Sequence, residues 1–395
     1  MKNILLITPL YPVPSSDNKS TQVCHFFARD WKKMGNNVIS IHFQHEYPWA
    51  WHMLIKLFGK KINHKLDGIF YGDSLKKTQS YTMDGVPVYR MPVSKLLPGR
   101  FPKRSLRKFR KELKQILEEN AFVPDVIVGH MLSIEVIPYI NELYHTKTCM
   151  VSHGEPVNKK RYPEYKQLID SYDLWGFRSK AIQKTFEDNY GTVRKSFICY
   201  SGIPDYYITK KNVHVFSNTI SRFLYVGSLI SRKHPSLLPI ALNKVYPQKE
   251  FSLTYVGDGE EKAHIIEAVE KLGLCENVRM LGKIPRENIV EQYDNAECFI
   301  MISHNEAYGL VYLEAMARGC IVIASRNEGI DGIVVDGVNG FLCNAGDVEE
   351  LTVVIKRINN LTQSEKQKIS DEAIETAKRF TDEKAAMLYL SDLEK

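Results

Sequence analysis

Two glutamates, Glu306 and Glu314, stand eight positions apart in the stretch from Ala296 to Phe341. They are too far apart to form a close catalytic pair on one helical turn, since a fully helical span would separate them by roughly 12 Å at 1.5 Å per residue. This separation suits a long ligand with one carboxylate near each end. The same spacing also fits an ordinary strand–helix–strand unit that carries surface acids.

The residues around the two glutamates predict one such unit. An apolar strand at Cys298–Ile302 is followed by a polar loop and by a helix that begins at Gly309 and ends at Gly319. A second apolar strand follows at Cys320–Ala324, which indicates a parallel sheet. Ligands of open α/β sheets bind at the carboxyl ends of the strands, where the polar loop lies.

The start of the predicted helix favours a negatively charged ligand. The first N–H groups, around Leu310 and Val311, have no partner within the helix. Together with the helix dipole they favour an anion such as a diphosphate.

Other candidate residues follow the ends of predicted strands. Arg232 and Lys233 could neutralise a diphosphate leaving group without a metal, although a solvated basic turn has the same composition. His153 ends a strand of the first half, and a lone histidine is more often structural. Gly257 lies in a tight turn, but the dinucleotide fingerprint would need a glycine at Lys262.

The elements that must position these residues form two α/β halves. A chain of 395 residues is expected to have two domains, and the polar stretch Ile203–Asn218 is the best candidate linker. We predict two doubly wound, Rossmann-like parallel-sheet domains that face a cleft, at residues 1–205 and 206–381. The segment His45–Arg100 is predicted to be irregular, because aromatic residues are scattered through it without a clear period.

Composition points to an intracellular protein. No apolar run approaches the ~20 residues that span a bilayer, and the short apolar run near the N-terminus is interpreted as a β-strand and not as a signal peptide. Seven cysteines without a CxxC pair argue for a reducing compartment, with neither a disulfide framework nor a zinc site. We therefore expect a cytoplasmic protein that binds no metal.

The net charge of +7 is concentrated in one segment. Lys95–Lys114 holds nine Lys or Arg and a single acid, Glu112. An amphipathic helix is predicted over Lys103–Glu119, with Leu96, Leu97, Pro98 and Phe101 as apolar neighbours. A basic face with apolar neighbours suits an anionic membrane surface, although charge runs are usually solvated helix faces. The candidate membrane-binding residues are Arg104, Arg107, Lys108 and Lys111.

Taken together, the motifs resemble those of the retaining, nucleotide-sugar-dependent glycosyltransferases of the GT-B fold. This family (glycosyl transferases group 1) has an E-x7-E motif, which corresponds to Glu306 and Glu314 in NEAYGLVYLEAMARG. Further family features occur in order: VGSLISRK, YVGDGEE, ENVRMLGKIP, IVIAS and DGVNGFL. The first half resembles the family more loosely, in PDVIVGH, VSHG and RSKAIQKTF.

The resemblance implies roles for particular residues. Glu306 would contact the transferred sugar, Glu314 the ribose and Lys233 the diphosphate, while His153 approaches the sugar from the first domain. The final helix, 382–395, would cross back onto that domain. The remaining positions assigned to the donor site are Arg232, Gly257, Lys283, Tyr308, Gly309, Leu310 and Val311.

Two positions depart from the family pattern. Ser228 stands where the family usually has an arginine, and Arg232 is the candidate to replace it. Asn18 and Lys19 stand where the family often has two glycines, in a loop assigned to the acceptor side. Asparagine tolerates a positive φ better than most residues.

The resemblance implies a metal-independent, retaining hexosyltransferase without a cofactor. Its donor would be a UDP- or GDP-sugar, and its acceptor a saccharide or lipid-linked sugar of bacterial surface polysaccharide, lipopolysaccharide or capsule synthesis. Binding to the inner face of the cell membrane is expected, and binding to nucleic acid is not. The alternatives are a non-catalytic scaffold and an epimerase or phosphorylase of the same fold.

Overall fold

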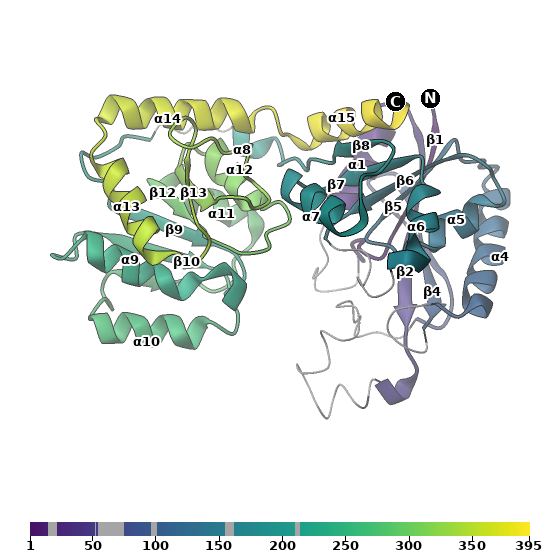
Figure 1. Ribbon diagram of the computed structural model, residues 1–395, viewed down its shortest axis with the longest axis horizontal. Coiled ribbons are helices and arrows are strands. Elements are labelled where there is room, and N and C mark those ends of the chain that lie inside the picture. Colours follow the sequence, from purple (N-terminus) through teal and green to yellow (C-terminus); the bar gives the residue numbers. More distant parts are fainter. Residues whose placement is uncertain (15–21, 52, 54–74, 96–100, 155–161, 210–213) are drawn as a thin grey trace. The chain divides into compact units, whose positions relative to one another are not determined.

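A computed structural model describes residues 1–14, 22–51, 53, 75–95, 101–154, 162–209 and 214–395. The chain divides into two compact α/β units (Figure 1). The first unit comprises Met1–Arg178, Ile182–Cys199 and Ala386–Lys395, and the second comprises Ser179–Ala181 and Tyr200–Ala385. The main boundary therefore falls at Cys199, a few residues before the predicted position 205.

The first unit contains an eight-stranded sheet with the order β3-β4-β2-β1-β5-β6-β7-β8. Neighbouring strands are parallel except for β3, which runs antiparallel to β4. Continuous apolar runs such as that of β1 are typical of parallel strands covered on both faces. The strands are β1 (Asn3–Thr8), β2 (Asn37–Glu46), β3 (Gln79–Met83), β4 (Val86–Ser94), β5 (Val126–His130), β6 (Lys147–Ser152), β7 (Leu174–Phe177) and β8 (Ser196–Ile198).

The prediction of an irregular segment up to Arg100 is wrong for β3 and β4, which form a hairpin. Asp84 and Gly85 link the two strands with positive φ angles of 46° and 78°. This is the backbone that a two-residue hairpin turn requires, and an Asp-Gly pair is a strong signal for it. The signal for the turn was therefore present in the sequence.

Helix α15 (Asp382–Glu394) joins the first unit through its later turns, from Ala386 onward. The Tyr389 ring packs against Phe27 and Trp31, at centroid distances of 5.2 and 5.0 Å. The Trp31 indole donates a hydrogen bond to the main-chain oxygen of Ala386. The other helices of this region are α1 (Val23–Lys33), α4 (Lys103–Glu119), α5 (Val136–Asn141), α6 (Tyr162–Asp170) and α7 (Lys180–Tyr190).

The second unit contains six parallel strands in the order β11-β10-β9-β12-β13-β14. The chain moves outward from β9 to β11 and then returns to place β12 on the other side of β9. The strand order thus reverses between β9 and β12, and ligands of open α/β sheets bind at such a switch point. The strands are β9 (Arg222–Val226), β10 (Ser252–Val256), β11 (Val278–Met280), β12 (Cys298–Ile300), β13 (Ile321–Ser325) and β14 (Phe341–Cys343).

Helices cover both faces of this second sheet, and Figure 1 shows its strands between α14 and α10. Helix α12 begins and ends as the sequence predicts, with Gly309 before its first residue and Gly319 after its last turn. The helices of this unit are α8 (Tyr206–Thr209), α9 (Leu238–Val245), α10 (Lys262–Leu272), α11 (Arg286–Asn295), α12 (Leu310–Ala317), α13 (Val348–Asn359) and α14 (Gln363–Ala377).

Two further expectations can be compared with the structure. All seven cysteines are free in the structure. In the described parts of the chain, no helix combines the length and the apolar character that crossing a bilayer requires.

Candidate active site

The loops that follow β9 and β12 are joined at the switch point of the second unit. The first contains Arg232 and Lys233 in a short 3₁₀ helix, and the second contains Glu306. The main-chain N–H of His304 donates to the Arg232 main-chain oxygen at 2.7 Å. The Arg232 guanidinium donates back to the main-chain oxygens of His304 and Asn305, at 3.2 and 3.3 Å. These reciprocal bonds join the two loops. They thereby bring three predicted site residues close together, namely Arg232, Lys233 and Glu306.

Two cations share the Glu306 carboxylate. Glu306 Oε2 lies 3.3 Å from Arg232 Nη1 and 3.4 Å from Lys233 Nζ. The side chains of Glu306 and Lys233 are only 12% and 13% exposed, whereas that of Arg232 is 41% exposed. Burial lowers the pKa of Lys233, and the neighbouring Glu306 charge offsets part of this shift. The loops therefore hold a partly desolvated positive centre beside one carboxylate.

The backbone of Glu306 is fixed by the loop that follows β13. Its N–H donates to Glu328 Oε2 at 2.7 Å, and its main-chain oxygen accepts from the N–H of Gly329 at 2.8 Å. A Cβ on Gly329 would lie 2.5 Å from the Glu306 main-chain oxygen, so this approach requires glycine. Sequence reasoning missed Glu328 and Gly329, because nothing in their local pattern links them to Glu306.

The N-terminus of α12 opens next to this cluster. Gly309 has a φ of 80°, and no side chain caps the helix there. A Cβ at Gly309 would come within 2.5 Å of the Tyr312 ring. The N–H groups of Leu310 and Val311 belong to the first turn, where intrahelical acceptors are missing. Glycine thus permits a close approach to a positively polarised helix end.

Tyr308, which we assigned to the donor site, has a supporting position. Its side chain is 3% exposed, and its hydroxyl donates to the main-chain oxygen of Ser201 at 2.9 Å. The buried ring therefore anchors the loop between β12 and α12.

Glu314 lies within α12 and is held by α11. Its side chain is buried, with Oε1 2.6 Å from Arg286 Nη2 and Oε2 3.2 Å from the Tyr293 hydroxyl. Sequence reasoning missed both partners. Arg286 is 28 positions away, and its place at the start of α11 would only have indicated a solvated helix end.

Glycines follow the carboxyl ends of β9, β10 and β11, where the backbones of the three strands come close together. Gly257 has a φ of 143°, and a Cβ there would lie 1.8 Å from the Gly227 main-chain oxygen. The Gly257 N–H donates to the Gly282 main-chain oxygen at 2.8 Å. Lys283 follows directly and is exposed in the loop before α11. Gly257 therefore serves close strand packing, and Lys283 remains accessible.

His153 follows β6 in the first unit, within a chain of aromatic groups. Its Nε2 lies 3.0 Å from His130 Nδ1, and His130 Nε2 lies 3.1 Å from the Tyr389 hydroxyl. Burial, the Arg178 charge and His130 hold the pKa of His153 well below its ordinary value. His153 is therefore a neutral imidazole near pH 7 whose ring is oriented by His130. Asn18 and Lys19 lie outside the described residues.

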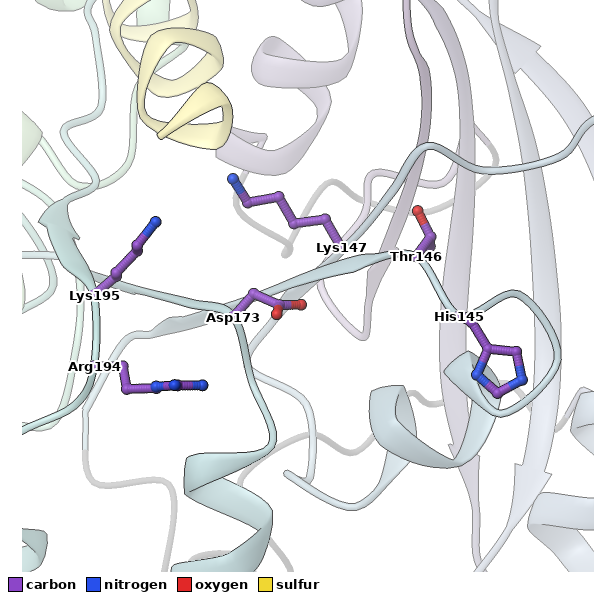
Figure 2. Close-up of a pocket in the computed structure, with 6 residues that line it drawn as sticks. All are labelled: His145, Thr146, Lys147, Asp173, Arg194 and Lys195. Carbon is purple, nitrogen blue, oxygen red and sulfur yellow. The ribbon is translucent and has the colours of Figure 1, made fainter.

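A hollow of about 630 Å³ lies elsewhere on the first unit, at the amino ends of β6, β7 and β8 (Figure 2). Lys147 and Lys195 point from it toward the end of α15, where they donate to the main-chain oxygens of Leu393 and Lys395. These lysines therefore anchor α15, at the opposite strand ends from His153. The lining residues are His145, Thr146, Lys147, Asp173, Arg194 and Lys195.

No metal-binding constellation accompanies the site in the described ranges. Among those residues, no three His, Cys, Asp or Glu side chains are grouped so that they could hold a metal ion.

Comparisons with known proteins show similarity over the second unit. Residues 208–379 match the family model described as glycosyl transferases group 1. An uncharacterized glycosyltransferase of Methanocaldococcus jannaschii is 25% identical over 268 residues, which are 67% of this chain and 70% of that protein. The N-acetyl-alpha-D-glucosaminyl L-malate synthase of Bacillus anthracis is 36% identical over 107 residues. That match covers 27% of this chain and only 28% of the synthase.

A solved structure resembles the whole chain. Anabaena HepE, in complex with UDP, has a TM-score of 0.71 at 18% identity, with 100% of both chains covered. A likeness at this identity shows the fold. The predicted fold class, two α/β domains of the GT-B type, is therefore confirmed.

Proposed function

Because residues 208–379 belong to the glycosyl transferases group 1 family, we propose that the protein is a retaining glycosyltransferase. It moves a sugar from a nucleoside diphosphate sugar to an acceptor hydroxyl. The observation that carries this proposal is the convergence of Arg232 and Lys233 on Glu306, at the switch point and beside the open N-terminus of α12. The complex of HepE with UDP supports a nucleotide donor of this kind.

The diphosphate of the donor binds at the cations and the helix end. Lys233 supplies a partly desolvated point charge, and Arg232 supplies a fork of N–H donors. The first N–H groups of α12, at Leu310 and Val311, add donors that are already oriented. These groups stabilise the negative charge that develops on the leaving diphosphate, so the reaction requires neither a divalent metal nor a cofactor.

The sugar and the nucleoside lie on either side of the diphosphate. Glu306 is assigned to the transferred sugar, where a carboxylate stabilises the oxocarbenium-like charge of the transition state. Glu314 is assigned to the ribose hydroxyls, and the accessible loop at Lys283 to the base. By the resemblance, His153 is assigned to the sugar as a neutral hydrogen-bonding group whose ring contacts His130.

The acceptor is proposed to be a lipid-linked or growing surface saccharide. This rests on α4, which buries one apolar side against the first sheet and leaves Arg104, Arg107, Lys108 and Lys111 exposed. Such a basic face attracts anionic lipid headgroups. Phe101, expected as an exposed apolar neighbour, is instead buried against Phe43, and Leu96, Leu97 and Pro98 lie outside the described residues.

A panel of nucleotide-sugars tests the proposed reaction. UDP-, GDP- and ADP-sugars are screened for a rise in the melting temperature, because a ligand that binds the folded state stabilises it by mass action. The release of nucleoside diphosphate is then measured for each sugar that binds. At least one sugar is expected to bind and to be slowly hydrolysed without an acceptor. Binding that is absent across the panel in the wild-type protein would overturn the proposal.

A further inference from the structure

We propose that Arg286 is a positioning residue that holds the Glu314 carboxylate for the nucleoside end of the donor. This inference rests on the proposed function, in which Glu314 accepts the ribose hydroxyls. Arg286 is the first residue of α11, and its Nη2 lies 2.6 Å from Glu314 Oε1.

The burial of Glu314 explains why it needs this partner. The Glu314 side chain is 5% exposed, and a carboxylate withdrawn from water is costly unless it is paired and hydrogen-bonded. Within the described parts of the chain, Arg286 makes the ion pair and Tyr293 the side-chain hydrogen bond that Glu314 receives. Burial alone would lower the pKa of Arg286, but the Glu314 charge raises it overall, so the cation persists at any working pH.

Helix α11 supplies both partners from one face. Arg286 and Tyr293 are seven positions apart, which is about two helical turns and places their side chains on the same side of the helix. Arg286 takes one carboxylate oxygen and Tyr293 takes the other, so the plane of the carboxylate is fixed. An ionised carboxylate has about four acceptor positions, and the two that remain can accept the two ribose hydroxyls.

Buried and stacked aromatic rings lie behind this pair. Tyr293 is fully buried, and its ring lies 6.2 Å from that of Tyr207. Tyr207 is stacked on Tyr206 at 4.7 Å. Arg286 itself is 35% exposed, so it stands at the border between this aromatic cluster and solvent. The Glu314 carboxylate is therefore already oriented before a nucleoside binds.

The effect of Arg286 on donor binding can be distinguished from that of Arg232 and Lys233, because Arg286 contacts a different glutamate. Arg232 and Lys233 contact Glu306 and are assigned to the phosphates directly, whereas Arg286 contacts Glu314 and acts through it. Loss of Arg286 should weaken the nucleoside part of binding and leave the phosphate part unchanged. The expected kinetic signature is a raised donor KM with a nearly constant kcat.

Calorimetry with UDP, GDP and inorganic pyrophosphate tests this separation. In Arg286→Gln, the dissociation constant of the better-bound nucleotide should rise about tenfold or more, as expected for losing a hydrogen bond to a charged group. The pyrophosphate affinity should change less than about twofold, since its contacts are intact. Arg286→Lys should restore part of the nucleotide affinity, because lysine keeps the charge but loses the planar fork.

A double-mutant cycle with Glu314→Gln shows whether Arg286 acts through Glu314. The double variant should bind the nucleotide no more weakly than Glu314→Gln alone, because both changes remove the same Arg286–Glu314 interaction. If Arg286→Gln does not fold, Tyr293→Phe replaces it, and that variant should weaken UDP or GDP binding severalfold without affecting pyrophosphate.

A matched control is Arg357→Gln, which breaks the Arg357–Asp336 ion pair of 2.6 Å in the same unit and should change no affinity. The inference about Arg286 would be overturned if the effects of Arg286→Gln and Glu314→Gln were additive, or if Arg286→Gln left the nucleotide affinity unchanged. Neither result would affect the proposed function. A wild-type protein that binds no nucleoside diphosphate would overturn the proposed function together with it.

Discussion

Lys233 Nζ lies 3.4 Å from Glu306 Oε2, and the same carboxylate oxygen lies 3.3 Å from Arg232 Nη1. Under the proposed function, an incoming diphosphate competes with Glu306 for both cations. Once the phosphates take the cations, the Glu306 carboxylate becomes available to the sugar. The proposed function therefore couples donor binding to the release of the Glu306 carboxylate from its two cations.

This exchange gives a two-sided prediction for Glu306→Gln. Turnover should fall at least ~100-fold, as when one preorganised charged group is removed from a transition state. UDP or GDP should bind more tightly, because the carboxylate that competes for the cations is gone. The melting temperature should fall, because Lys233, whose side chain is only 13% exposed, loses its carboxylate partner.

Rapid-quench kinetics and calorimetry measure the two effects separately. Glu267→Gln, an exposed glutamate on α10, serves as the control and should behave as the wild type. Near-normal turnover in Glu306→Gln would remove the catalytic assignment.

Lys233 should make donor binding sensitive to alkaline pH. Burial lowers its pKa below the ordinary value of 10.5, so the free protein loses this cation earlier than an exposed lysine would. As pH rises through the lowered pKa, the dissociation constant of UDP or GDP should increase. Lys233→Arg should lack this rise, because arginine stays charged. The nucleotide titrates identically in both proteins, so identical pH profiles would contradict the prediction.

The sequence predicted the parts of the site that depend on local order. The glycine before Leu310, the apolar strands around Glu306 and the basic turn at Lys233 are each set by neighbouring residues, and the structure contains each of them. It did not predict the pairing of Glu314 with Arg286. That contact depends on how α11 packs against α12, which no pattern within either helix specifies.

The missed hairpin has a different cause. Its turn signal at Asp84-Gly85 was local, but β4 also carries a buried arginine, Arg90, among its inward residues. Arg90 donates to the buried Gln44 on β2 at 2.5 Å, and this polar pair breaks the alternation expected of a half-buried strand. Such a pair of buried polar residues can be recognised only when the pairing of the two strands is known.

The reaction should proceed without a divalent metal. The sequence has no Asp-x-Asp motif, and in the proposed mechanism Arg232, Lys233 and the start of α12 match the diphosphate charge instead. Turnover should therefore be unchanged, within about twofold, after incubation with EDTA and removal of the chelator by gel filtration. Activity that disappears with EDTA and returns with Mn²⁺ or Mg²⁺ would exclude this mechanism.

The anomeric configuration of the donor sugar should be kept in the product. This expectation rests on the resemblance to retaining glycosyltransferases, whose E-x7-E motif corresponds to Glu306 and Glu314. The coupling constant of the anomeric proton in the glycoside product, recorded by NMR, distinguishes the two outcomes. An inverted centre would refute the retaining assignment.

The exposed basic face of α4 should bind anionic membranes. Helix α4 buries Leu106, Phe109, Leu113, Ile116 and Leu117, so its basic residues Arg104, Arg107, Lys108 and Lys111 point to solvent. Each Lys or Arg near an anionic surface contributes about 1 kcal/mol, and salt screens this attraction over about 10 Å at 0.1 M. Sedimentation with phosphatidylglycerol-containing vesicles should therefore show binding at low salt that weakens as salt is added.

Charge reversal distinguishes a localised face from net charge alone. Changing the four basic residues of α4 to Glu should abolish sedimentation with the vesicles. The control changes four exposed lysines of the second unit, Lys262, Lys271, Lys356 and Lys368, to Glu. Both variants have the same net charge, so a general attraction would weaken equally in the two, whereas a localised face would be lost only in the first. If the wild-type protein does not sediment with anionic vesicles at low salt, α4 is a solvated helix face and the acceptor is a soluble saccharide.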